Sequence, residues 1–134
     1  MRPVRWETEV CGKPPQEITL ETATGLQFAQ KELRVKAGQG VALTVSNPDS
    51  MPHNWVLTKP QALEAVTLLS AQMASEPDAY FRHYVPETTD ILCHTRLIDA
   101  GKKTIVFFDA PKVPGRYPYL CTFPGHAQIM RGVL

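Results

Sequence analysis

Residues 121–130, CTFPGHAQIM, are the most informative stretch of this chain for both fold and function. The stretch begins at the end of a predicted strand, and it places the thiol of Cys121, the imidazole of His126 and the thioether of Met130 in one short loop. A Pro-Gly pair lies between the thiol and the imidazole. Proline fixes φ and glycine relieves crowding, so the loop is expected to be tight and stiff. A stiff loop that gathers sulfur and nitrogen donors predicts a metal site.

These donor types favour copper. Two His and one Cys in a trigonal plane, with a weak axial Met, form the pattern of copper sites that transfer electrons. The loop supplies one His, so a second must come from elsewhere. His53 is the leading candidate because its segment, MPHNW, follows the turn at residues 47–50, and loops between strands project ligands from the end of a sandwich. His83 and His94 lie in less regular sequence and are more simply surface residues.

Around these loops the sequence has the pattern of a β protein. Twelve prolines and eight glycines indicate many turns. Residues 40–47, GVALTVSN, alternate apolar and polar side chains, as a half-buried strand does. The other predicted strands are 5–10, 18–22, 32–35, 54–59, 103–109, 116–121 and 132–134.

Residues 60–75 differ, because their apolar side chains recur at helical spacing after a proline. They predict one helix inserted into the β chain. No repeat or linker is visible, so residues 1–134 are interpreted as a single domain. The predicted fold class is an all-β Greek-key sandwich or barrel with this one inserted helix.

Composition excludes several partners. The formal net charge is +1 and the basic residues are scattered, which argues against nucleic acid or an anionic membrane. No apolar run approaches the roughly 20 residues that cross a bilayer. The first ten residues, MRPVRWETEV, lack the apolar core of a signal peptide. The chain is therefore expected to be cytosolic, a mature form, or a module of a longer protein.

The segments CTFPGHAQIM and PHNWVL resemble the two copper-ligand loops of azurin-like members of the cupredoxin, or blue copper, family. The helical insert, the segments DAYF and HTRLI, and the strand TIVFF follow in the family's order, so the resemblance covers residues 32–134. It implies a cupredoxin fold and one type 1 copper ion per chain, alternating between Cu(II) and Cu(I). It further implies an electron carrier rather than an enzyme, a monomer, and a periplasmic or otherwise extracytoplasmic location.

The resemblance also assigns ligand roles. His53, Cys121 and His126 match the three equatorial ligands, and Met130 matches the axial one. The backbone carbonyl of Pro52 matches a second, distant axial contact, at a position where the family usually has glycine. The more restricted backbone of proline affects how near that carbonyl can lie.

Further residues surround these ligands. Asn54 matches a residue that ties the two ligand loops together, and its backbone N–H and that of Phe123 are expected to point at the Cys121 sulfur. Four apolar residues are expected to ring the edge of His126: Met51, Phe123, Pro124 and Ile129. This ring either only shields the copper from water or forms a docking patch for redox proteins, which use small, weak interfaces.

The cysteine count is odd: Cys11, Cys93 and Cys121. In the family, an N-terminal cysteine forms a disulfide with a cysteine near the position of Gln39. Glutamine cannot form that bond, so Cys11 and Cys93 are expected to be unpaired.

Other functions remain open. The chain could be an electron-transfer module of a larger multidomain oxidoreductase. Copper storage, delivery or sensing would favour exposed, labile thiols. A cysteine enzyme using Cys121 with His126 would need an open pocket and an oxyanion hole. Zinc could also occupy a site with two His and one Cys, although the thioether favours copper.

Overall fold

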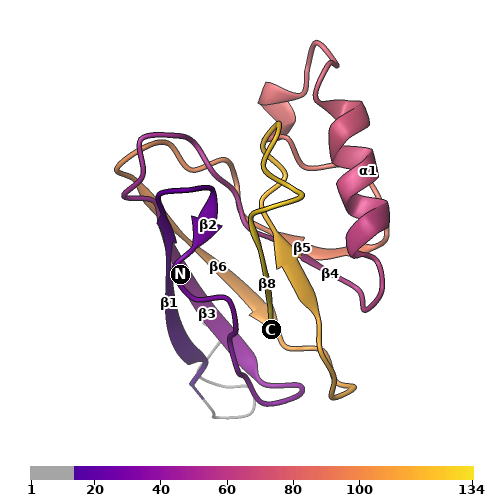
Figure 1. Cartoon of the computed structure of the whole chain (residues 1–134). Coiled ribbons are helices and arrows are strands. Elements are labelled where there is room, and N and C mark those ends of the chain that lie inside the picture. Colours follow the sequence, from indigo (N-terminus) through magenta and orange to yellow (C-terminus); the bar gives the residue numbers. More distant parts are fainter. Residues whose placement is uncertain (1–13) are drawn as a thin grey trace.

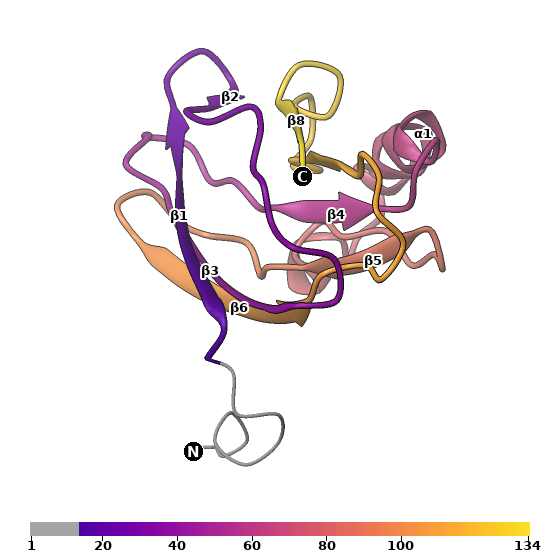
Figure 2. The ribbon, with the colours of Figure 1, turned by 90° about the horizontal axis from the view of Figure 1, so that it is seen from below.

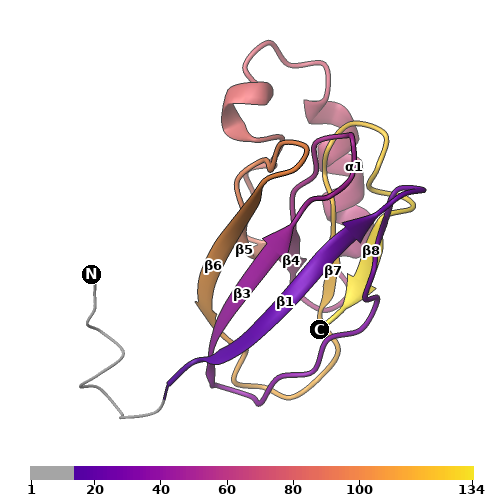
Figure 3. The ribbon, with the colours of Figure 1, turned by 90° about the vertical axis from the view of Figure 1, so that its left-hand side faces the viewer.

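The computed structural model describes residues 14–134, which form two four-stranded sheets (Figure 1). The first sheet has the order β2 (Gln27–Phe28), β1 (Gln16–Ala23), β3 (Gly40–Ser46) and β6 (Lys103–Asp109). The second has the order β5 (Ile91–His94), β4 (Val56–Thr58), β7 (Pro118–Leu120) and β8 (Arg131–Val133). Strands β1 and β3 are parallel, and the other strand pairs are antiparallel. Figure 3 shows β1, β3 and β6 side by side, with the second sheet behind them.

The core fills the space between the two sheets. On β3, Val41, Leu43 and Val45 are buried and their neighbours are half-buried, which confirms the predicted alternation. These side chains belong to the same apolar cluster as Trp55 and Tyr119 from the other layer. Because side chains on a strand alternate between its two faces, every second residue of β3 contributes to this core.

One α-helix, α1 (Leu63–Met73), covers the outer face of the second sheet (Figure 2). Its Val66 packs with Val56 of β4 and Leu120 of β7. The inserted helix predicted over residues 60–75 is therefore present, but it is shorter. Gln61 has a left-handed backbone, with φ of 65°, so the helix cannot begin at the preceding proline. A 3₁₀ turn, η1 (Tyr80–Arg82), follows in the segment that connects α1 to β5.

One predicted strand is absent and two are shorter than expected. Residues 32–35 form no strand, only an isolated bridge between Glu32 and Val133, so this prediction was wrong. Of residues 116–121, only Pro118–Leu120 are a strand. Of residues 54–59, only Val56–Thr58 are a strand. The backbone N–H groups of Asn54 and Trp55 donate to side chains, to the sulfur of Cys121 and to the hydroxyl of Thr95, instead of to a neighbouring strand.

Two observed strands were not predicted. Strand β2 has only two residues, too few to give a periodic signal. Strand β5 lies at the edge of its sheet, and its Leu92 and His94 are exposed, so its sequence does not alternate as a core strand does. The predicted strand at 5–10 lies outside the described residues.

The two candidate ligand loops meet at one end of the sheets. The loop at 47–53 leads from β3 toward β4, and the loop at 121–130 joins β7 to β8. His53 also forms an antiparallel bridge with Ile98, which fixes the first loop against the chain before β6. Among residues 14–134, no helix combines the length and the apolar character needed to cross a membrane.

Candidate metal centre

The structure brings three of the predicted donors together. Within residues 14–134, three side chains of metal-binding type converge: His53, Cys121 and His126. Their possible ligand atoms all lie within 4.8 Å of one another. The Nδ1 atoms of His53 and His126 lie 3.8 Å and 3.7 Å from the Cys121 sulfur. All three side chains are buried. This arrangement can surround a single metal ion and exclude water from it.

The loop at 121–130 is closed by its own backbone. The N–H of Cys121 donates to the Met130 carbonyl at 3.0 Å, and the N–H of Met130 donates to the His126 carbonyl at 2.8 Å. Gly125 has φ of 83°, in the left-handed region that glycine enters without strain. The side chain of Met130 is fully buried in the same cluster as Cys121. The short loop therefore places its thiol, imidazole and thioether on the inner side.

Asn54 ties the two loops together, as predicted. Its side-chain oxygen accepts the backbone N–H of Thr122 at 2.7 Å, and its nitrogen donates to the Thr122 hydroxyl and to the His83 carbonyl, both at 2.9 Å. The Thr122 hydroxyl in turn donates to the Tyr84 carbonyl at 2.7 Å. The sequence did not identify Thr122 as part of this network, because its partners lie far away in the chain.

Burial sets the protonation of the donors. It raises the pKa of the Cys121 thiol to about 11, although the backbone N–H groups of Asn54 and Phe123 partly oppose the shift. A metal that binds must therefore displace the thiol proton. Burial, followed by the positive charge of His53 when it is protonated, lowers the pKa of His126 to about 4. At neutral pH the His126 ring is uncharged and has a lone pair for a metal.

Asp49 is a contact of the site that sequence reasoning missed. Its Oδ2 lies 2.8 Å from Nε2 of His53, on the side of the ring opposite to the nitrogen that faces Cys121. This hydrogen bond, followed by one from the backbone N–H of Ser50, holds the pKa of the Asp49 carboxyl below its usual value. An acidic residue four positions before the candidate ligand, at a turn, was the available signal.

Other predicted residues lie outside the cluster. His83 and His94 are exposed. Pro52 is half-buried beside His53. Cys93 forms no disulfide with any residue in the described range, and burial raises the pKa of its thiol to about 12. Cys11 lies outside that range, so the prediction that it is unpaired stays a prediction.

The four apolar residues of the predicted ring differ in exposure. Met51 is 41% exposed and Ile129 is 61% exposed, while Phe123 and Pro124 are half-buried. The Phe123 ring packs against the imidazole of His126, with centroids 4.9 Å apart. On its other side it contacts the ring of Tyr84 at 5.2 Å. Only 2% of His126 is exposed, and Phe123 is one of the side chains that cover it.

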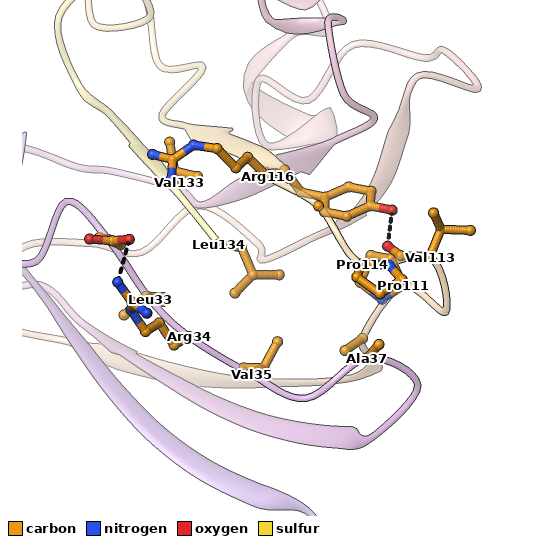
Figure 4. Close-up of a pocket in the computed structure, with 14 residues that line it drawn as sticks. Leu33, Arg34, Val35, Ala37, Pro111, Val113, Pro114, Arg116, Val133 and Leu134 are labelled. Carbon is orange, nitrogen blue, oxygen red and sulfur yellow. Dashed lines mark hydrogen bonds and ion pairs between the residues drawn. The ribbon is translucent and has the colours of Figure 1, made fainter.

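A separate hollow of about 350 Å³ lies away from the donors, where residues 32–37 approach residues 110–117 and the last two residues (Figure 4). Leu33, Val35 and Leu134 are among its lining residues. Its polar contacts include an exposed ion pair between Arg34 and Glu32 at 3.4 Å. This hollow contains no converging set of donors, so the chemistry of the described chain is concentrated at the other end.

Comparisons with known proteins agree with this geometry. A family model described as copper binding proteins of the plastocyanin/azurin family matches residues 16–134. Auracyanin-A from Chloroflexus aurantiacus is 35% identical over 111 residues, which cover 81% of this chain and 66% of that protein. Azurin from Pseudomonas denitrificans is 34% identical over 118 residues, covering 81% of this chain and 88% of that protein. The solved structure of auracyanin A, described as a "blue" copper protein, has a TM-score of 0.78 at 33% identity and covers 90% of this chain and 98% of that chain.

Proposed function

Because the chain belongs to the plastocyanin/azurin family of copper-binding proteins, we propose that His53, Cys121, His126 and Met130 hold one copper ion as a type 1 site. The protein is a blue copper electron carrier and not an enzyme. The observation that supports the ligand assignment is the convergence of one thiol and two imidazoles within 4.8 Å, all buried. Two nitrogens and a thiolate, with a nearby thioether, are the donors that electron-transfer copper prefers.

A bound copper ion supplies a one-electron couple, Cu(II)/Cu(I). The protein's own part is to hold the donors still and to keep water away. Asn54 makes three hydrogen bonds to the other loop, two with Thr122 and one with Cys121. One is the 3.5 Å contact from the Asn54 backbone N–H to the Cys121 sulfur. Because these contacts join protein atoms of the two loops directly, little rearrangement is expected when the charge of the ion changes.

Two axial contacts complete the proposal. The Met130 thioether would be the weak axial donor to a bound copper, which its full burial in the same cluster as Cys121 supports. The Pro52 carbonyl would be the distant axial contact, which its position directly before His53 supports. Met130→Leu is expected to keep the blue colour and to raise the reduction potential, because it removes a donor that favours Cu(II).

The ligand proposal is tested by titrating the metal-free protein with Cu(II) and recording its visible absorption. We expect an intense blue band that saturates at one copper per chain, and no such band in Cys121→Ser. Cys93→Ser is the matched control, because it removes the other thiol of the described residues and should retain the band. An unchanged blue band in Cys121→Ser would refute the assignment.

The burial of Cys121 disfavours two alternatives. A storage or delivery protein needs a thiol that exchanges metal readily, whereas this sulfur is fully buried. A cysteine enzyme needs a reactive thiolate, whereas burial raises the pKa of this thiol to about 11. Zinc fits the same nitrogen and sulfur donors but gives no blue band, so the titration also distinguishes the two metals.

Electrons are proposed to enter and leave through an apolar docking patch made of Met51, Phe123, Pro124 and Ile129. The contact of Phe123 with His126 supports this, because it links the patch to a ligand. Electron self-exchange between oxidised and reduced copies, measured by NMR line broadening, tests the patch without a known partner. Met51→Lys should slow self-exchange and leave the blue band unchanged.

Val113→Lys provides the control for the docking patch. Val113 is 71% exposed and lies beside the hollow that is remote from the donors. Val113→Lys adds the same charge as Met51→Lys, but far from the docking patch. The self-exchange rate of Val113→Lys should therefore stay near that of the wild type. Equal rates in the two variants would contradict the docking patch.

The remaining assignments are also proposals. Residues 1–134 are proposed to be one domain, which the family match over residues 16–134 supports. We propose a monomer in the periplasm or another extracytoplasmic compartment. The runner-up is an electron-transfer module of a larger oxidoreductase, and the matched region is 66% of auracyanin-A. Sedimentation of the protein and fractionation of cells that express the full gene test these points.

A further inference from the structure

Asp49 lies in the loop that carries His53, and its carboxylate is almost withdrawn from solvent, with 8% of the side chain exposed. Both carboxylate oxygens have partners. Oδ2 lies 2.8 Å from Nε2 of His53, and Oδ1 accepts the backbone N–H of Ser50 at 2.8 Å. Burying a carboxylate is costly unless it is hydrogen-bonded, so this geometry couples Asp49 closely to the imidazole.

Asn47 holds the backbone that presents Asp49. Its side-chain oxygen accepts the N–H of Asp49 at 3.1 Å and the hydroxyl of Thr22 at 2.7 Å. Its side-chain nitrogen donates to the carbonyls of Met51 and Ile98, at 2.8 Å and 2.9 Å. Asn47 is fully buried, so the carboxylate stands on a fixed support and not on a free loop.

We propose that Asp49 is a positioning residue of the copper site, whose carboxylate holds His53 in the tautomer with its proton on Nε2. Nδ1, 3.8 Å from the Cys121 sulfur, then keeps its lone pair for the metal. A neutral imidazole has one donor and one acceptor nitrogen, so fixing one fixes the other. The inference rests on the proposed ligand role of His53.

The carboxylate also places a negative charge beside one of the two imidazoles. His53 has the Asp49 carboxylate as its neighbour, whereas His126 packs against the uncharged ring of Phe123. A negative charge beside His53 attracts Cu(II) more strongly than Cu(I), because the attraction scales with the charge of the ion. Asp49 therefore lowers the reduction potential and strengthens Cu(II) binding.

Two substitutions separate shape from charge. Asp49→Asn keeps the size of the side chain and an acceptor oxygen but removes the charge. Asp49→Ala removes both. Asp99→Asn is the control, because it removes one exposed carboxylate next to Ile98, which pairs with the His53 backbone. The measurements are the reduction potential, the Cu(II) affinity by competition, and the solvent exchange of the His53 ring N–H by NMR of the Cu(I) protein.

We expect Asp49→Asn to retain the blue band with a higher potential than wild type. Asp49→Ala should also raise the potential, bind Cu(II) roughly 10- to 100-fold more weakly, and exchange its His53 ring proton at least about tenfold faster. Asp99→Asn should match wild type in all three measurements.

The inference would be overturned if Asp49→Asn had the reduction potential of the Asp99→Asn control, because this substitution removes only the charge. This conclusion would hold even if Asp49→Ala failed to fold. A wild-type protein without a blue band would instead refute the proposed function, so the two failures are distinguishable.

Discussion

His53 and His126 present the same atom to the same sulfur, but different forces hold them in place. Their Nδ1 atoms lie 3.8 Å and 3.7 Å from the Cys121 sulfur, and their ring centroids are 5.0 Å apart. His53 is hydrogen-bonded to the Asp49 carboxylate at 2.8 Å. His126 has its ring packed against Phe123 instead, with centroids 4.9 Å apart. One candidate ligand is held by a charged hydrogen-bond partner, and the other packs against an apolar ring.

This difference explains how one site can be both rigid and accessible to electrons. The hydrogen-bonded side, with Asn47 and Asp49, connects the site to the interior of the fold. On the other side His126 packs against the half-buried Phe123, and Ile129, whose backbone N–H donates to the His126 carbonyl, is 61% exposed. A charged group on that second side would oppose the close approach of another protein.

The largest expected effect is on the colour of the copper site when each imidazole is deleted in turn. In His126→Gly, external imidazole should enter from the apolar rim and restore a strongly coloured copper site. In His53→Gly, restoration should be at least about tenfold weaker, because the nearly buried Asp49 carboxylate loses its hydrogen-bond partner there. Cu(II) titrations with and without imidazole measure both. Equal restoration in the two variants would show that the two sides of the site do not differ.

A smaller effect is expected where the two loops are joined. Asn54→Ala leaves the Thr122 N–H and the His83 carbonyl without their buried partner, so the free energy of unfolding should fall by about 4 kcal/mol. Denaturant unfolding measures this loss. Thr122→Val is the matched variant, because it removes the hydroxyl but keeps the backbone N–H that Asn54 accepts. If Thr122→Val lost as much free energy of unfolding as Asn54→Ala, the contact between the Asn54 side chain and the Thr122 backbone N–H would not be the important one.

The smallest effect concerns His126 in the metal-free protein. Its pKa is 6.5 in the unfolded chain and about 4 in the folded one, so below pH 6.5 the unfolded state binds the proton first. The free energy of unfolding is therefore highest above the pKa of His126 in the unfolded chain. It decreases as the pH falls toward the pKa of His126 in the folded chain. From pH 7.5 to 5 the free energy of unfolding should fall by about 2 kcal/mol.

Unfolding curves at several pH values check this expectation, with His126→Gln as the control that lacks the titrating ring. In the copper-loaded protein the dependence should be much weaker from this cause, because a bound metal keeps the imidazole unprotonated. The same slope in His126→Gln and in wild type would show that another group is responsible.

Much of the fold was predictable because its signals are local. The alternation along β3 and the apolar repeat of α1 follow from side-chain periods of two residues and of 3.6 residues. The segment at 32–35 has an apolar pattern as well, but only Glu32 bridges to Val133. Strand β5 gave no clear pattern because an edge strand exposes residues such as Leu92. Whether each of these two segments becomes a strand depends on pairing with another strand and not on its own sequence alone.

The amino-acid sequence was sufficient to select the candidate donors, because Cys121, His126 and Met130 lie in one loop and His53 lies in a second loop of recognisable pattern. The pairing of β4 with β7 within the second sheet was needed to bring Nδ1 of His53 within 3.8 Å of the Cys121 sulfur, since 68 residues separate the two in the chain. The contact of Asp49 with His53 has a similar origin, although the two residues are close in sequence. It depends on Asn47, which is held by Thr22 and Ile98 from distant segments. Local chemistry specifies which atoms can bind a metal, whereas hydrogen bonds between distant segments specify how those atoms are held.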